Sequence, residues 1–235
     1  MNIVLLTTET PHHAYFAREL VEGFGLGGIF LERRQAVPAF ETAHPFEQKR
    51  DEYERDVLAR DIVACAGLAR TCQFQSFNDK EAVTALRALR PDVLLLFGSG
   101  KISADVRQCA SIACLNLHGG SPEHYRGLDN HLWTIYHREF QHLMTTLHRV
   151  EERLDTGDIV FQEPLKLERS TELHELRSIT TRVCVDLALR ALQSLSGTGR
   201  LPSRPQSQIG RYYSFMPAAL KDACITNLRH HLASR

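Results

Sequence analysis

An asparagine and a histidine stand two positions apart in the tripeptide Asn116-Leu117-His118, at the end of an apolar run. Alternate side chains of a strand point to the same face, so these two polar groups would lie side by side. A carboxamide can donate hydrogen bonds to an oxygen that gains negative charge, and an imidazole can move a proton. Acyl transfer requires both tasks. The simpler alternative is that both side chains only satisfy backbone groups at a strand end.

Two further stretches could contribute to the same site. The first is the loop 119–127, with the sequence GGSPEHYRG, which directly follows His118. The second is the acidic turn 154–159, with the sequence LDTGDI, between two predicted strands. Its aspartates, Asp155 and Asp158, could instead be ordinary Asx-turn residues.

Taken in order, Asn-x-His, Tyr-Arg-Gly and Leu-Asp-Thr-Gly-Asp-Ile resemble the formyltransferase family that uses 10-formyltetrahydrofolate. The resemblance covers about residues 91–163. It implies that Asn116, His118 and Asp155 are the catalytic residues. Asn116 and a protonated His118 would hold the oxyanion while an amine attacks the formyl carbon. Asp155 would orient His118 and help to move the amine proton.

The resemblance also implies where the folate binds. Residues 97–100, which end the central strand, match the place where family members press backbone against the pterin ring. The acidic turn 154–159 would cover the other side of that ring. The glycines of the first stretch could alternatively mark only a tight turn. The residues predicted to contact the folate are Phe97, Gly98, Ser99, Gly100, Leu154, Thr156, Gly157 and Asp158.

The acceptor side departs from the family pattern. Many members have Pro-Ser-Leu-Leu-Pro after the histidine, whereas this chain has Gly-Gly-Ser-Pro-Glu-His. We predict acceptor contacts from Tyr125 and Arg126 in that loop. His12 and His13 begin the first predicted helix and could meet an anionic acceptor group there. The alternatives are surface loop residues for the first pair and helix caps for the second.

The predicted function is N-formyl transfer to a small amine, with a nucleotide-linked amino sugar as the leading acceptor. The first loop, residues 7–13, lacks the Gly-Ser-Asn-Gly phosphate cradle of glycinamide ribonucleotide enzymes. The residues after Leu201 are too few for the extra domain of methionyl-tRNA enzymes. One alternative is a formyltetrahydrofolate hydrolase, which in this family carries a regulatory domain first. Another is a non-catalytic folate- or nucleotide-binding module.

The elements around these motifs predict a three-layer α/β fold with a mostly parallel, Rossmann-like sheet. Residues 3–6 and 26–31 are apolar runs with a helical pattern between them, which indicates a β-α-β unit. Residues 92–97 (DVLLLF) read as a central strand buried on both faces. A strand near Phe74 and a helix over 79–90, capped by Asp79, precede it.

The later elements complete this arrangement. Residues 33–60 predict a loop and a solvated helix, and residues after 202 an irregular stretch with a tail helix. We therefore predict a catalytic domain over 1–201 and a short C-terminal extension over 202–235. The other predicted elements are strands over 111–118, 145–150 and 159–167, a helix over 130–138 and a long helix from about residue 170 to Gly197-Thr198-Gly199.

Composition narrows the class of protein. Lys plus Arg and Asp plus Glu each number 28 in 235 residues, so no net field favours nucleic acid or an anionic membrane. No leader or membrane-length apolar run is present, which predicts a cytoplasmic protein. The six cysteines lack zinc-ligand spacing, and we expect no metal and reduced thiols. The predicted partner is a small-molecule amine; a homodimer is compatible with the sequence.

Overall fold

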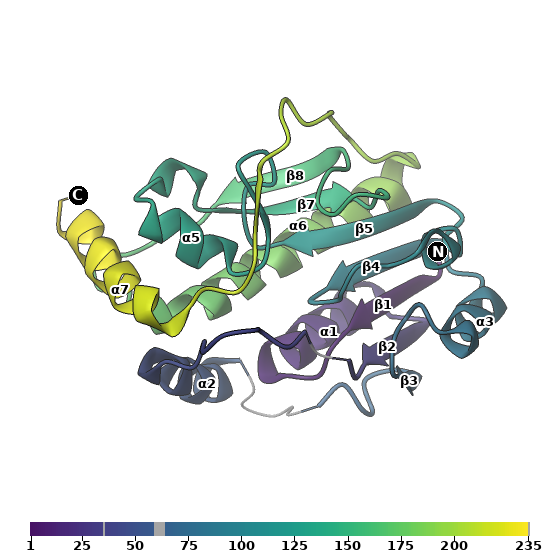
Figure 1. Cartoon of the computed structure of the whole chain (residues 1–235). Coiled ribbons are helices and arrows are strands. Elements are labelled where there is room, and N and C mark those ends of the chain that lie inside the picture. Colours follow the sequence, from purple (N-terminus) through teal and green to yellow (C-terminus); the bar gives the residue numbers. More distant parts are fainter. Residues whose placement is uncertain (35, 59–63, 235) are drawn as a thin grey trace.

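The computed structural model describes residues 1–34, 36–58 and 64–234, and a seven-stranded sheet forms the centre of this part (Figure 1). Five strands are parallel, β7 is antiparallel to β5, and β8 is antiparallel to β7. The fold class predicted from the sequence is confirmed. The strand order is β3 (Thr71–Phe74), β2 (Gly28–Glu32), β1 (Ile3–Thr7), β4 (Val93–Phe97), β5 (Ala113–His118), β7 (Met144–Arg149) and β8 (Ile159–Pro164).

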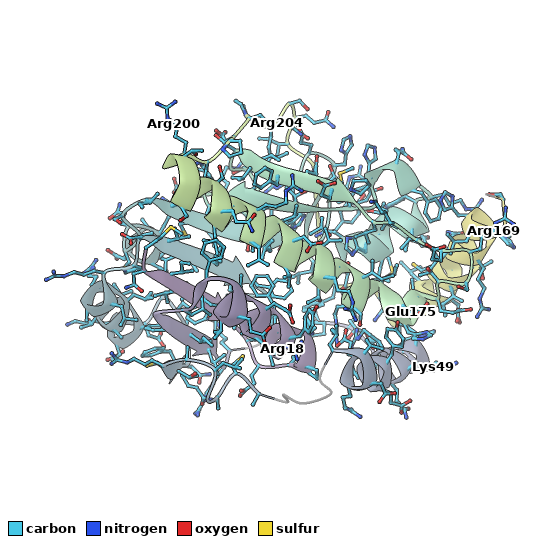
Figure 2. All side chains as sticks on the ribbon, turned by 180° about the vertical axis from the view of Figure 1, so that it is seen from behind. Arg18, Lys49, Arg169, Glu175, Arg200 and Arg204 are labelled. Atoms are coloured by element: carbon cyan, nitrogen blue, oxygen red, sulfur yellow. The ribbon has the colours of Figure 1, made fainter. Side chains whose placement is uncertain are left out.

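Helices cover both faces of the sheet. Helices α1 (Pro11–Phe24) and α6 (Leu176–Thr198) run side by side across one face, as Figure 2 shows. Helices α3 (Lys80–Leu89) and α4 (Ala104–Arg107) pack on the other face through Val83, Leu86 and Val106. Every residue of β1 and β4 is buried between these layers, which explains their unbroken apolar sequences.

A third apolar cluster lies beside the sheet, where α2 (Pro45–Val57), α5 (Asn130–Tyr136) and α7 (Ala218–Ala233) meet (Figure 1). A helix is present in the segment predicted to be solvated, and most of α2 is exposed or half-buried, but Phe46 and Glu54 are buried. The buried Lys221 of α7 donates to Glu47 of α2. Residues 35, 59 and 60 of the predicted loop-and-helix segment lie outside the described residues.

Helix α3 lies within the predicted range 79–90, but its start differs in detail, and the start of α6 differs in position. Asp79 precedes α3, but its carboxylate accepts from Ser76 N and makes no cap hydrogen bond with the helix. Helix α6 starts at Leu176, later than predicted, because Leu173–Glu175 forms a 3₁₀ turn before it. Its predicted end at Gly199 is confirmed, and this glycine has a φ of 68°.

The segment after α6 adds an element that sequence patterns do not reveal. Strand β9 (Arg211–Tyr213) pairs in parallel with β6 (Tyr125–Gly127), which lies in the loop after β5. Three residues are too few to produce a readable alternation of apolar and polar side chains. No helix of the described residues is long and apolar enough to cross a membrane.

Candidate active site

A cavity of about 510 Å³ opens at the carboxyl ends of β4 and β5. Besides residues of β5 and β7 themselves, two groups of residues line it. Residues 98–102, which follow β4, and residues 150, 151, 153 and 154, which follow β7, form what we call the strand-end lining. Side chains of α2, α5 and α6, together with Tyr212 of β9, form what we call the helical lining. Ligands bind at this edge of open α/β sheets, because strand ends there leave loops free to carry polar groups.

The three predicted catalytic residues all line this cavity. His118 Nδ1 lies 3.7 Å from Asp155 Oδ1, and both side chains are buried. Asn116 is connected to the same carboxylate through His148, whose Nε2 lies 3.1 Å from Asn116 Nδ2 and 3.5 Å from Asp155 Oδ1. The strand end and the acidic turn therefore meet, as the sequence predicts.

The hydrogen bonds of His118 identify its titrating nitrogen. Its Nε2 lies 2.9 Å from the carbonyl oxygen of Tyr125, which can only accept, so Nε2 carries a hydrogen. Nδ1 is then the nitrogen that takes up a proton, and it faces Asp155. Burial lowers the pKa of His118 more than Asp155 raises it. The neutral form is thus favoured at neutral pH, in contrast to the protonated form predicted from the sequence.

His148 is a site residue that sequence reasoning missed. Its Nδ1 lies 2.7 Å from the carbonyl oxygen of Arg149 and therefore carries a hydrogen, and its Nε2 lies within reach of both the Asn116 amide and the Asp155 carboxylate. The register of the antiparallel pair β5 and β7 places His148 directly opposite Asn116. The sequence predicts that His148 lies in a strand, but nothing in the local sequence indicates that its partner is Asn116.

Asp155 lies in a turn held in an unusual conformation. Its φ is 55°, a left-handed value that few non-glycine residues adopt. Burial alone would raise the pKa of Asp155, but His118, His148 and the hydrogen bond from Gly127 N together lower it. The carboxylate is therefore ionised. Gly157 is required in this turn, because a Cβ there would lie 1.9 Å from Arg149 O.

Residues 26–187 match the Formyl transferase family. The chain belongs to this family. Curated relatives include methionyl-tRNA formyltransferases from Gloeothece citriformis, 28% identical over 66% of this chain and 45% of the relative, and from Halothermothrix orenii, 25% identical over 81% and 60%. The chain spans about half the length of the curated relatives it matches.

Solved structures share the fold of this formyl transferase family member. A 4-N formyltransferase from Francisella tularensis has a TM-score of 0.63 at 13% identity, over 97% of this chain and 87% of that one. The structure of PseJ from Anoxybacillus kamchatkensis contains UDP-4,6-dideoxy-4-formamido-L-AltNAc and tetrahydrofolate. Its TM-score is 0.54 at 19% sequence identity, over 91% of this chain and 86% of PseJ. HypX from Aquifex aeolicus, in complex with tetrahydrofolic acid, has a TM-score of 0.60 at 17% sequence identity, over 97% of this chain and 34% of HypX.

Half of the predicted folate contacts line the cavity of this family member. The predicted contacts that line it are Gly98, Ser99, Gly100 and Leu154. The other four, Phe97, Thr156, Gly157 and Asp158, are not among the lining residues. Gly98 has a φ of 75°, and a Cβ there would lie 2.2 Å from His13 Nε2. The hydroxyl oxygen of Ser99 is buried without a hydrogen-bond partner among the described residues. The strand-end lining therefore offers a free polar group to a ligand.

The four predicted acceptor contacts do not line the cavity. His12 and His13 are buried, and His12 faces Glu54 at 3.5 Å. Tyr125 donates through its hydroxyl to Glu139, and its backbone carbonyl holds His118. Arg126 donates from Nε to the carbonyl oxygen of Leu154 at 2.9 Å. Tyr125 and Arg126 thus contact His118 and the acidic turn, which carry predicted catalytic residues, instead of facing the cavity.

The helical lining contains residues that the sequence did not single out. Asn130 and His131 from α5, Arg177 from α6 and Tyr212 from β9 all face the cavity. Burial lowers the pKa of His131 to about 4, so this ring is a neutral hydrogen-bonding group. These residues come from distant parts of the chain, so no local sequence motif indicates that they share a site. The described residues include no cluster of His, Cys, Asp and Glu suited to a metal ion.

Proposed function

We propose that this chain transfers a formyl group from 10-formyltetrahydrofolate to the amine of a small molecule. The observation that carries the proposal is the convergence of Asn116, His118 and Asp155 on one cavity, together with family membership. Because the chain spans about half of its curated relatives, the activity and the acceptor both belong to the proposal.

The cavity fits the formyl donor. A volume of about 510 Å³ is within the range of about 300–1,000 Å³ for small-molecule sites. The unpartnered Ser99 hydroxyl and the backbone at Gly98 and Gly100 offer hydrogen-bonding groups along the strand-end lining. We assign the pterin to the space between Gly98–Gly100 on one side and Leu154 on the other. When bound, 10-formyltetrahydrofolate supplies the formyl carbon and the leaving nitrogen N10.

The acceptor amine forms a bond to the formyl carbon, the bond from that carbon to N10 breaks, and the proton lost by the amine ends on N10. The Asn116 amide uses one hydrogen for His148 and keeps a second for the formyl oxygen, where negative charge develops. Neutral His118 accepts the amine proton at Nδ1. The ionised Asp155 stabilises the resulting imidazolium and helps His118 to release the proton to N10.

The helical lining is our candidate acceptor site. It combines apolar side chains with Asn130, His131 and Arg177, which suits a polar molecule with a ring or carbon skeleton. A nucleotide-linked amino sugar remains the leading acceptor. The similarity in fold to PseJ, whose structure contains a UDP-linked formamido sugar, supports this choice. Methionyl-tRNA is the acceptor in the curated relatives' names, so it belongs in the same test.

The test is turnover of 10-formyltetrahydrofolate by the purified chain with three acceptors: a UDP-linked 4-amino-4,6-dideoxy sugar, glycinamide ribonucleotide and methionyl-tRNA. Tetrahydrofolate is followed by absorbance and the formamide product by mass spectrometry. We expect both products with the amino sugar and neither with His118→Asn. Formate release without any amine would identify a hydrolase. Folate binding without tetrahydrofolate formation in any reaction would identify a binding module and overturn the proposal.

A further inference from the structure

Residues 203–213, which we call the C-terminal strap, lie against the acidic turn 154–159, although the family match ends at residue 187. Figure 1 shows this yellow-green segment passing over the front of the molecule toward α7. Arg204 and Ile159 exchange two backbone hydrogen bonds of 2.8 and 2.9 Å. Farther along, Arg211–Tyr213 pairs with Tyr125–Gly127. The strap therefore contacts the regions that follow both Asp155 and His118.

Gln206 is the strap residue that binds the turn itself. Its Nε2 donates to the carbonyl oxygen of Asp155 at 2.9 Å and to that of Gly157 at 2.8 Å. Carbonyl oxygens only accept, so the amide nitrogen and not the amide oxygen must face them. Both amide hydrogens are thus committed to the backbone on either side of Thr156.

The turn needs such support because of its backbone conformation. The left-handed φ of Asp155 is disfavoured by about 1 kcal/mol for a residue with a Cβ. Strained conformations of this kind persist only where neighbouring groups hold them in place. Arg126 holds Leu154 O on one side, and Gln206 holds the carbonyl oxygens of Asp155 and Gly157.

The strap is anchored firmly to the loop after His118. The buried Glu123 carboxylate accepts from both Arg204 guanidinium nitrogens, at 3.0 and 2.8 Å, and from Ser207 N at 2.7 Å. The hydrogen bonds from Arg204 lead the causes that lower the pKa of Glu123 to about 2, so this pair stays charged at neutral pH. Gln206 lies between these two anchor residues and is fixed relative to His118.

We propose that Gln206 is a positioning residue that holds the Asp155 turn so that the carboxylate faces His118 Nδ1. The inference rests on the proposed function, in which Asp155 supports His118 during proton transfer. Without the Gln206 amide, the turn can relax toward negative φ and carry the Asp155 carboxylate away from the histidine. The residues after 201 are then part of the catalytic unit, and not an appendage to it.

Two substitutions separate hydrogen bonding from packing. Gln206→Met keeps a side chain of similar length but has no donor, whereas Gln206→Lys restores an N–H donor group. We expect kcat to fall about a hundredfold in Gln206→Met, since small displacements of catalytic groups have effects of this size. Gln206→Lys should recover most of the loss, and affinity for 5-formyltetrahydrofolate should change less than about threefold in both. The matched control is Gln48→Met, because the exposed Gln48 amide binds Glu52 of its own helix α2 and contacts neither the turn nor the strap.

A second measurement does not depend on turnover. The pKa of His118 is read by NMR of the imidazole nitrogens, with the signal assigned by its loss in His118→Asn. Because the Asp155 charge raises the pKa of His118, this pKa should fall further in Gln206→Met and recover in Gln206→Lys. A wild-type His118 pKa in Gln206→Met would overturn the inference.

The two proposals fail in different ways. If the wild-type chain transfers no formyl group, the proposed function is refuted while the NMR comparison still decides whether Gln206 positions Asp155. Thermal unfolding shows whether each variant folds. If Gln206→Met is unfolded, Gln206→Asn replaces it, because its shorter amide cannot span both carbonyls. An unchanged His118 pKa in that variant would equally refute the role of Gln206.

Discussion

Two clusters of buried histidines lie near the same edge of the sheet, and each faces a buried carboxylate. The distances are similar: 3.7 Å from His118 Nδ1 to Asp155 Oδ1, and 3.5 Å from His12 Nδ1 to Glu54 Oε2. Only the first cluster lines the cavity. The first cluster contains His118, His148 and Asp155, and the second contains His12, His13 and Glu54.

The clusters differ in what neutralises the carboxylate. Burial would raise the pKa of Glu54, but the hydrogen bond with His12 and the hydrogen bonds from two nitrogens of Arg177 lower it to about 2. Among the described residues, Asp155 has no Lys or Arg within ion-pair distance and meets only histidines and a backbone N–H. A carboxylate paired with arginine fixes structure, whereas one paired with histidine can support proton transfer.

The largest difference should be in turnover. We expect His118→Asn and Asp155→Asn to lower kcat by about two to three orders of magnitude, because they act where charge develops in the transition state. Affinity for 5-formyltetrahydrofolate should stay nearly unchanged. The control is His12→Gln, which should leave kcat per folded molecule unaltered. Near wild-type turnover in His118→Asn would remove any catalytic distinction between the two clusters.

For the free energy of unfolding we expect the reverse: a substitution of Glu54 in the second cluster should have a larger effect than one of Asp155 in the first. Glu54→Ala leaves Arg177 without its main partner, and we expect the free energy of unfolding to decrease by about 3 kcal/mol. Asp155→Asn should change this free energy much less, since an amide keeps the shape of the turn. Urea unfolding of both variants measures the difference. Equal losses of stability would mean that the two carboxylates have the same structural role.

Ligand binding should distinguish the cavity from the closed cluster. Saturation with 5-formyltetrahydrofolate at a hundredfold excess over the dissociation constant should stabilise the folded state by about 2.7 kcal/mol. Ser99→Val, which removes the unpartnered hydroxyl in the cavity, should reduce this shift, and His12→Gln should not. A thermal scan with and without the folate checks both. Absence of a shift in the wild-type protein would contradict the folate assignment.

The smallest expected effect concerns pH and stability. Burial lowers the pKa of His12 below its ordinary value of 6.5, so the folded state binds fewer protons there than the unfolded state. The free energy of unfolding should therefore decrease as the pH falls below about 6.5, and carboxylates such as Glu54 add to this only below about 4.5. His12→Gln should flatten the slope between these values without altering the pH profile of kcat. Urea unfolding over pH 4.5–6.5 tests this, and an unchanged slope would contradict it.

Much of the fold follows from local patterns in the sequence. The apolar runs that became β1 and β4 are buried along their whole length, and such runs are readable because burial on both faces excludes polar residues. Alternation within β5 also placed Asn116 and His118 on one face, and the motifs brought Asp155 to the same site. These inferences needed only the period of a strand and the order of three motifs.

The tertiary structure alone decided which other groups complete the site. His148 meets Asn116 through the register of β5 and β7, and Gln206 meets Asp155 from 51 positions along the chain. His12 and His13 begin a helix, as the sequence indicates, but the packing of α2 and α6 buries His12 beside Glu54 and away from the cavity. Secondary structure depends on interactions between near neighbours, whereas these contacts depend on how distant elements pack. For that reason the sequence predicted which polar residues meet at the candidate site, and only the fold showed what holds them.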